Sequence, residues 1–288
     1  MKVVDAIVKI LKKEKVENLN CYPTTPIIEA AARADIRPIV CRQERVGLGI
    51  ADGYARVTNG EVPSVFAMQY GPGAENAFPG IATAYSDSTP MLILPLGHPL
   101  NRDKVFPMFS SLKSYESVTK SIEQITTPDR TVDAMRRSIA SMKIGRPGPV
   151  MLEVPEDIVN QDVDDDLVNN YIPIKPVLSE ANSDDISNAV KILLKAKNPI
   201  IIAGAGVLYS SASEELSIFS KLLKIPVMTT TEGKSAISEH RNPFALGSGS
   251  GVMSDPVYHF LKDADVVFAI GTSLTRHPMV TTIPPGKT

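Results

Sequence analysis

Apolar and polar positions in the first half of the chain follow helical and strand spacing in turn. Residues 3–16 repeat apolar side chains at helical spacing and place lysines on the opposite face, which predicts an amphipathic helix. Strands are predicted from short apolar and β-branched runs at 18–21, 37–41, 62–69, 91–96 and 150–154. Helices are predicted after the first three, the first of them with Thr25 as N-cap and Pro26 as its first residue, and again at 131–143. The Ser-rich segment 100–121 has no clear period and is expected to be a loop.

The second half repeats the same alternation. Helices are predicted at 184–196, 213–223 and 255–261, and strands at 199–203, 226–230 and 264–270. Strands that alternate with helices at this spacing favour parallel sheets covered on both faces. We therefore predict an α/β protein with two three-layer domains, at 1–160 and 183–288, joined by a linker at 161–182. The second sheet is expected to be incomplete, because no covering helix follows residue 270.

Composition and charge narrow the classes of protein. A net charge of −2 gives no reason to expect nucleic acid or an anionic membrane surface as partner. No run approaches the roughly 18 apolar residues of a membrane span, and residues 1–5 do not resemble a signal peptide. The cysteines Cys21 and Cys41 make no disulfide framework and are expected to be buried at strand ends. A cytoplasmic protein is the expectation.

The helix that follows the strand at 37–41 is unusually rich in small residues. Gly47, Ala51 and Ala55 fall on one face, and Gly49 and Gly53 form a second small stripe. Each helical glycine costs up to about 1 kcal/mol relative to alanine, so three of them need a reason. We expect close approach of another backbone or of a flat ligand. Glu44, in the first turn of this helix, is the main candidate for a functional carboxylate.

A second candidate is Gly71-Pro72-Gly73, which lies between a predicted strand and a predicted helix. Its amides would face the carboxyl edge of the sheet, where open parallel sheets bind ligands. This arrangement suits an anion or a polar ring held by backbone groups. An ordinary strand–turn–helix junction is the alternative interpretation.

Taken together, these stretches resemble a known domain. Arg42-Gln43-Glu44, the helix at 51–56 and Gly71-Pro72-Gly73-Ala74-Glu75-Asn76 resemble the amino-terminal, pyrimidine-binding domain of thiamine-diphosphate-dependent enzymes. Within that superfamily the chain resembles the group of acetolactate synthase, glyoxylate carboligase and the 2-oxo acid decarboxylases, which residues 81–90 and 145–150 also match. The resemblance is strong over residues 1–160 and continues more weakly through the second domain.

The resemblance implies a role for each candidate. A glutamate at the position of Glu44 hydrogen-bonds the pyrimidine ring nitrogen of thiamine diphosphate, so Glu44 is expected to be catalytic. The residues expected to bind the cofactor are Pro23, Thr24, Gly71, Pro72, Gly73 and Asn76. The implied activity is that of a lyase or synthase acting on a 2-oxo acid, either decarboxylation or acetolactate synthase-like carboligation.

Three departures from the family pattern concern the loop at Pro23, the substrate preference and the acetolactate synthase assignment, in that order. Thr24-Thr25 stands where the family has Gly-Gly, and Gln43 replaces the histidine that commonly precedes the glutamate. Phe106-Pro107-Met108 lies in the region where synthases carry a catalytic glutamine.

The second domain resembles the central domain of the family, which binds FAD in some members. Gly204-Ala205-Gly206 after a strand is a weak dinucleotide signal, and a tight strand–helix turn is its alternative. Residues 247–251 are expected to be a flexible ligand loop or a linker. The histidines have no metal-ligand spacing, and no protein metal site is expected at His98, His240, His259 or His277.

Family members hold the diphosphate and Mg²⁺ through a carboxy-terminal domain with Gly-Asp-Gly and a downstream Asn. The sequence has no such segment; Asp52 and Asn76 imitate the spacing, but Asp52 falls within a helix. We therefore expect half of a split enzyme or a truncated chain, inactive alone. The expected partners are a second copy, in a homodimer or tetramer, and a subunit carrying the diphosphate-binding domain.

Two other interpretations remain open: a non-catalytic regulatory or scaffold subunit of a split enzyme, and an ordinary nucleotide-binding α/β protein. In the resembled family the Glu44 helix packs at a dimer interface. Gly47, Ala51 and Gly53 are then expected to be close-packing positions, and Gly47→Leu is expected to weaken dimerisation before it unfolds the monomer.

Overall fold

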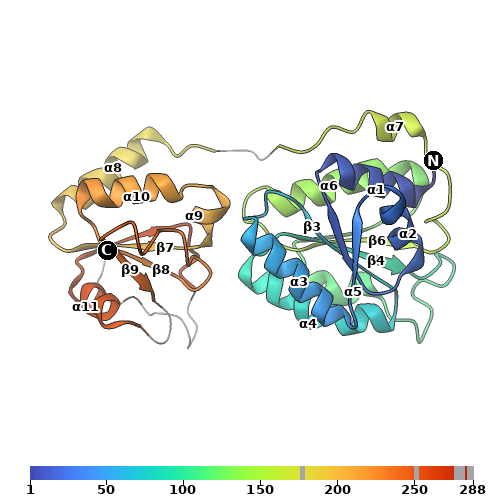
Figure 1. Ribbon diagram of the computed structural model, residues 1–288, viewed down its shortest axis with the longest axis horizontal. Coiled ribbons are helices and arrows are strands. Elements are labelled where there is room, and N and C mark those ends of the chain that lie inside the picture. The colour runs from blue at the N-terminus through green and yellow to red at the C-terminus, as the bar shows by residue number, and fades with distance from the viewer. Residues whose placement is uncertain (176–178, 250–252, 276–282, 284–288) are drawn as a thin grey trace. The chain divides into compact units, whose positions relative to one another are not determined.

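The computed structural model describes residues 1–175, 179–249, 253–275 and 283. The chain divides into two units, Met1–Val177 and Leu178–Thr288. Each unit contains a parallel sheet with helices on both faces (Figure 1). The predicted fold class, two parallel-sheet α/β domains, is confirmed.

The sheet of the first unit has the order β2-β1-β3-β4-β6-β5. Its strands are β1 (Asn18–Cys21), β2 (Arg37–Val40), β3 (Ser64–Met68), β4 (Met91–Gly97), β5 (Ser121–Gln124) and β6 (Val150–Pro155). The side chains of β3 and β6 are buried along their whole length, because helices cover both faces of the sheet. All these strands run in parallel, so their carboxyl ends meet at one edge.

Two layers of helices enclose this sheet. The helices are α1 (Val3–Lys13), α2 (Thr25–Arg33), α3 (Glu44–Val57), α4 (Pro72–Asp87), α5 (Ser111–Tyr115), α6 (Thr131–Lys143) and α7 (Asp165–Asn169), with short 3-10 turns at Glu116–Val118 and Pro128–Arg130. Figure 1 shows α1, α2 and α6 on one face and α3, α4 and α5 on the other. Two hydrophobic clusters fill the spaces between these layers and the sheet.

Two local predictions for the first unit are wrong. The N-cap of α2 is Thr24, which is extended at φ −142° and ψ 97°, so Pro26 is the second helical residue. Proline fits there because the first four amides of a helix have no intrahelical partner. The segment 100–121 is not only loop: it contains α5 and leads into β5, an edge strand whose side chains are half-buried. Such a strand has a weak apolar signal in the sequence.

Part of the interval predicted as linker lies against the first unit. The buried carboxylate of Glu14 accepts hydrogen bonds from the Tyr171 hydroxyl at 2.6 Å and from the Ile174 amide at 3.0 Å. Its other oxygen pairs with Lys143 Nζ at 3.2 Å. Burial raises the pKa of the Tyr171 phenol, and so do the hydrogen bond and the charge of Glu14, so the hydroxyl keeps its proton and donates. These contacts hold the end of the segment on α1.

The sheet of the second unit has the order β10-β7-β8-β9. Its strands are β7 (Pro199–Ala203), β8 (Val227–Thr229), β9 (Ala245–Ser248) and β10 (Val266–Ile270), and its helices are α8 (Ser183–Lys195), α9 (Ala205–Tyr209), α10 (Ser213–Leu223) and α11 (Asp255–Asp263). Figure 1 shows α8, α9 and α10 on one face and α11 on the other. The sequence did not predict α9 or β9, which are short and carry glycines that lower both helix and strand propensity.

Within the described ranges, no helix combines the length and the apolar character needed to cross a membrane. Cys21 and Cys41 are free and buried, as predicted.

Candidate functional site

Glu44 is the first residue of α3 and lies just beyond the carboxyl end of β2. Gln43, in extended conformation, is the N-cap that turns the chain from strand to helix. The Glu44 residue is only 4% exposed, which is unusual for a carboxylate. The positive end of the helix dipole compensates part of the cost of burying this negative charge.

The first turn of α4 contacts this carboxylate. Asn76 Nδ2 donates a hydrogen bond of 2.6 Å to Glu44 Oε2. Gly73 lies so close that a β-carbon there would be 3.1 Å from Glu44 Oε1 and 2.8 Å from Gln69 Cγ. The structure therefore brings Glu44, Gly73 and Asn76 together, although the sequence separates them by about thirty positions.

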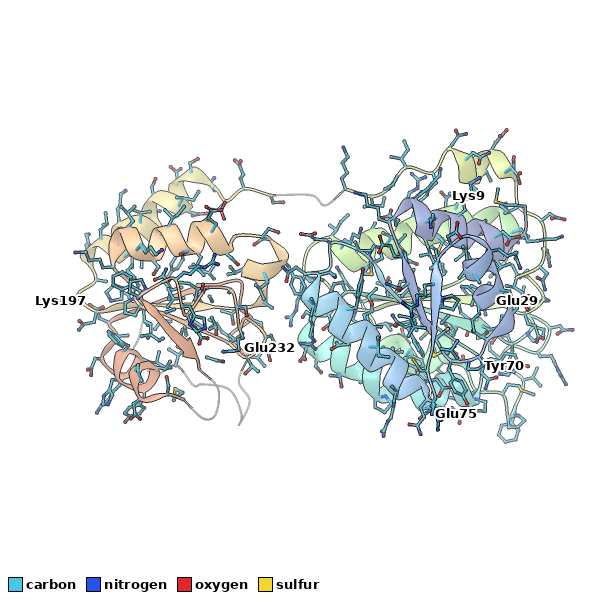
Figure 2. All side chains as sticks on the ribbon, in the orientation of Figure 1. Lys9, Glu29, Tyr70, Glu75, Lys197 and Glu232 are labelled. Atoms are coloured by element: carbon cyan, nitrogen blue, oxygen red, sulfur yellow. The ribbon has the colours of Figure 1, made fainter. Side chains whose placement is uncertain are left out.

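Gly71 and Pro72 form the turn that starts α4. Gly71 is the N-cap and adopts φ 57° and ψ −115°, a left-handed conformation that favours glycine. Pro72 is the first helical residue, where the missing amide hydrogen costs no hydrogen bond. Figure 2 labels the flanking residues Tyr70 and Glu75 at the same end of the unit. These residues place the N-terminus of α4 beside that of α3.

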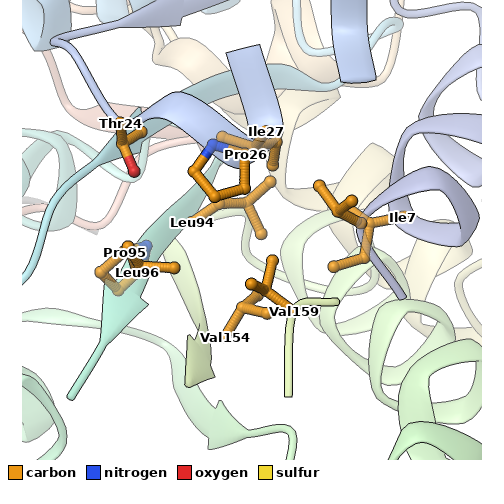
Figure 3. A pocket seen from close by; sticks show the side chains of 10 residues that line it. Ile7, Thr24, Pro26, Ile27, Leu94, Pro95, Leu96, Val154 and Val159 are labelled. Atoms are coloured by element: carbon orange, nitrogen blue, oxygen red, sulfur yellow. The ribbon is translucent and has the colours of Figure 1, made fainter. Parts of the chain in front are cut away.

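Pro23 and Thr24 follow β1 at the same edge of the sheet. The preceding residue, Tyr22, donates its amide to the Ala67 carbonyl of β3 at 3.2 Å. Pro23 is exposed, whereas Thr24 is 4% exposed and its hydroxyl has no hydrogen-bond partner among the residues that the structure describes. The Thr24 hydroxyl points into a small apolar pocket lined by residues of α1, α2, β4 and β6 (Figure 3). This pocket lies in the layer of α1 and α2, whereas Glu44 contacts α4 on the other face.

Tyr115, at the end of α5, is a site residue that the sequence did not indicate. Its side chain is fully buried, and its hydroxyl donates to the carbonyl of Ala74 in the first turn of α4. Burial and, second, the charge of Glu44 raise the pKa of the Tyr115 phenol. The only available signal was the three-residue spacing of Leu112 and Tyr115, which is too short to establish a helical period.

A second buried carboxylate, Glu153 of β6, lies near the same edge of the sheet. It is 6% exposed and accepts a hydrogen bond of 2.7 Å from Gln124 Nε2. A β-carbon at Gly97 would be 2.8 Å from Glu153 Cγ, so glycine at that position leaves room for this side chain. Burial raises the pKa of the Glu153 carboxyl, against the opposing effect of hydrogen bonds from Gln124 and Ser111.

This raised pKa predicts how stability depends on pH. A group whose pKa is higher in the folded state contributes stability below its unfolded value of 4.5, and this contribution is lost as the pH rises through the folded value. Glu153→Gln cannot ionise, so its free energy of unfolding should increase relative to that of the unsubstituted chain as the pH rises above 4.5. Urea titrations across this range test the expectation, with Glu156→Gln, an exposed neighbour, as control. A constant difference across the range would contradict it.

The small residues of α3 fall into two groups with different surroundings. Gly47 faces the sheet, where a β-carbon would lie 2.3 Å from Cε2 of the fully buried Phe66, and Ala51 is also buried. The expectation that Gly47 and Ala51 are close-packing positions at a dimer interface is therefore wrong. These residues are small because the sheet of the same unit packs closely against them. At Gly49 and Gly53, none of the described residues comes within 4 Å of the position of a β-carbon.

The glycines of the second unit also have a packing explanation. A β-carbon at Gly204 would lie 2.4 Å from the Gly271 carbonyl oxygen, and one at Gly206 would lie 2.6 Å from Gly271 Cα. Of the two interpretations of Gly204-Ala205-Gly206, the structure therefore favours the tight turn, because the backbone that follows β10 fills the space beside both glycines.

Other candidates give no ligand cluster. In the predicted loop at 247–251, residues 247 and 248 belong to β9, and Ser250 and Gly251 lie outside the described residues, as does His277. Within the part of the chain that the structure describes, no three His, Cys, Asp or Glu side chains gather in a way that could hold a metal ion.

Comparison with known proteins gives the same picture for both units. Residues 1–123 match the family described as thiamine pyrophosphate enzyme, N-terminal TPP binding domain, and residues 186–287 match the thiamine pyrophosphate enzyme central domain. The chain is 36% and 34% identical to the probable acetolactate synthase large subunits of Methanococcus aeolicus and Methanocaldococcus jannaschii, over 94% of its length and 46% and 47% of theirs. It is 27% identical to a probable 2-ketoarginine decarboxylase of Pseudomonas aeruginosa, over 93% of its length and 48% of that protein. The chain thus spans about half the length of these relatives.

Proposed function

Because the chain belongs to the thiamine pyrophosphate enzyme family, in the acetolactate synthase-like group, we propose that it is the part of a 2-oxo acid lyase or synthase that activates the pyrimidine ring of thiamine diphosphate. The observation that carries the proposal is the buried Glu44 carboxylate, whose Oε2 is held by Asn76 at 2.6 Å. The proposal includes the activity itself, which is either cleavage of a 2-oxo acid by a lyase or the joining of two substrates by a carboligase.

The residues at the edge of the sheet fit a pyrimidine ring. Among the described residues Glu44 Oε2 accepts from Asn76, and Oε1 accepts from no donor, so Oε1 can face a ring nitrogen and share a proton with it. Gly73 keeps the space beside Oε1 free of a side chain, and open space surrounds the β-carbon position of Gly71. Pro23 and Thr24 belong to the neighbouring loop after β1, and the Thr24 side chain faces the layer of α1 and α2, so we propose that this loop contacts the cofactor through its backbone. When bound, thiamine diphosphate supplies the electron sink for the loss of carbon dioxide from the 2-oxo acid.

The diphosphate and its Mg²⁺ are assigned to a domain other than the two described here. This assignment rests on the family resemblance, in which a carboxy-terminal domain with Gly-Asp-Gly and a downstream Asn holds both groups. We do not extend the proposal to FAD, because only the family resemblance suggests it and packing accounts for the glycines that gave a weak dinucleotide signal.

A second copy of the chain is the proposed partner for the outer face of α3. Val46, Ile50 and Val57 are exposed there, beside the open positions of Gly49 and Gly53. A contiguous apolar face of this kind favours association over exposure to water. Glu44 starts the same helix but lies on its buried face, so this proposed contact concerns association of two copies and not the carboxylate itself.

The test is a chimera in which this chain replaces the corresponding half of the Methanococcus aeolicus relative. With thiamine diphosphate, Mg²⁺ and pyruvate, the chimera should release carbon dioxide, whereas the chain alone should show little turnover. Robust turnover by the chain alone would overturn the assignment of the diphosphate to another domain. A chimera that folds but is inactive would favour the alternative function, a non-catalytic regulatory or scaffold subunit.

A further inference from the structure

A proline interrupts the backbone hydrogen bonding of α4 after its first two turns. Pro79 lies inside α4 and has no amide hydrogen, so the carbonyl of Glu75 lacks its usual partner four residues later. Gly73 and Asn76, the two residues that contact Glu44, belong to the part of the helix before this break. The helix by itself therefore fixes their position less firmly than an uninterrupted helix would.

Tyr115 supports the first turn of α4 from the side. Its hydroxyl donates to the carbonyl of Ala74, and its ring lies 5.3 Å from the ring of Phe78, one turn further along α4. The Tyr115 side chain is fully buried, so water does not compete for the hydrogen bond. One side chain thus contacts α4 at two points immediately before the proline.

The position of Tyr115 is itself well fixed. Thr119 Oγ1 donates to the Tyr115 carbonyl at 2.8 Å, and the Ser110 side chain caps the start of α5 by accepting from the Lys113 amide at 3.4 Å. Burial and the charge of Glu44 keep the phenol protonated, because both raise its pKa. The hydroxyl is therefore a donor over the whole physiological pH range.

We propose that Tyr115 is a positioning residue for Glu44: by holding the first turn of α4 through the Ala74 carbonyl, it keeps Gly73 and Asn76 against the carboxylate. The positioning of Glu44 by Tyr115 is a property of the folded chain and does not depend on the proposed function. Only the expected effect of Tyr115 on catalysis rests on that function.

The test uses the chain without cofactor. In Tyr115→Phe the ring and its contact with Phe78 remain, and only the hydroxyl is lost. The side-chain amide protons of Asn76 and the backbone amide of Glu75, which donates to Gly71, should then exchange with solvent about tenfold faster in NMR. The carboxyl carbon of Glu44 should change its chemical shift.

Tyr171→Phe is the matched control. It removes the hydroxyl of another buried tyrosine whose partner, Glu14, is the C-cap residue of α1, far from α4 in the sequence. Exchange at Asn76 and the Glu44 carbon shift should stay unchanged in this variant. If Tyr115→Phe also leaves both unchanged, the proposal is overturned.

A second measurement does not depend on the folding of Tyr115→Phe. In Glu44→Gln the Cζ shift of Tyr115 should move and that of Tyr171 should not, since only Tyr115 shares its surroundings with Glu44. Equal shifts for both tyrosines, or none, would contradict the coupling.

A kinetic measurement separates the inference from the proposed function. In the chimera, Tyr115→Phe should lower kcat about tenfold with little change in KM for pyruvate, because the loss concerns orientation and not binding. If Glu44→Gln leaves the activity intact while the NMR changes occur, the proposed function fails and the positioning role of Tyr115 stands. If kcat is unchanged in Tyr115→Phe, the catalytic consequence is contradicted.

Discussion

Replacing Glu44 by glutamine should lower kcat of the chimera by about 10²- to 10⁴-fold, the usual contribution of a positioned acid–base group. Glutamine has nearly the same shape, and its side-chain oxygen can still accept from Asn76, so the contact of 2.6 Å is retained. What the substitution removes is the negative charge and the ability to exchange a proton with the ring. Steady-state kinetics with pyruvate measures the loss.

Glu75→Gln is the matched control for this substitution. Glu75 is an exposed carboxylate in the first turn of α4, and Figure 2 labels it at the same end of the unit. Its variant changes the net charge by the same amount and should keep nearly full activity. Equal activity in Glu44→Gln and Glu75→Gln would argue for a scaffold and against catalysis by Glu44.

Replacing Gly47 by alanine should lower the free energy of unfolding of the first unit by about 1–3 kcal/mol, a typical cost of overpacking. The new β-carbon would lie 2.3 Å from the ring of Phe66, which is fully buried, so the ring or the helix would have to shift. Gly47→Leu should prevent the unit from folding. The gain in helix propensity from glycine to alanine, up to about 1 kcal/mol, offsets only part of the cost.

Gly49→Ala makes the same chemical change two positions away, where a β-carbon meets nothing within 4 Å. It should therefore raise stability by up to about 1 kcal/mol through helix propensity. Urea titrations followed by circular dichroism compare the two variants. If both raise stability, the packing explanation for Gly47 is wrong.

Gly49→Leu adds a test of the proposed second copy: the monomer should fold, and sedimentation should show weaker self-association.

Much of the fold could be predicted from local patterns. The helices α1 and α6 and the strands β1 and β7 have the expected positions, because each carries a regular apolar period or a continuous apolar run. The helices and strands that were missed are α5, β5, α7, α9 and β9, all of five residues or fewer. Their stability comes from tertiary packing, and a single turn or a half-buried edge strand leaves no period to detect.

The candidate site divides in the same way. The sequence singled out Glu44, Gly73 and Asn76, and the structure brings these three together. The sequence did not indicate that the Thr24 hydroxyl points into the layer of α1 and α2. It also did not indicate that the Tyr115 hydroxyl donates to the Ala74 carbonyl. Both depend on which way a side chain points from a loop or a short helix, and local spacing does not define that direction.

The sequence alone determined the alternation of strands and helices, the family resemblance and the small-residue character of α3, since each depends on neighbouring residues or on short motifs. Only the tertiary structure decided what that character is for. Gly47 is small because Phe66, nineteen positions later in the chain, packs against it, whereas Gly49 faces open space. The two glycines look alike in the sequence. Their surroundings differ because folding, and not local spacing, decides which residues of a helix pack against the strand that it covers.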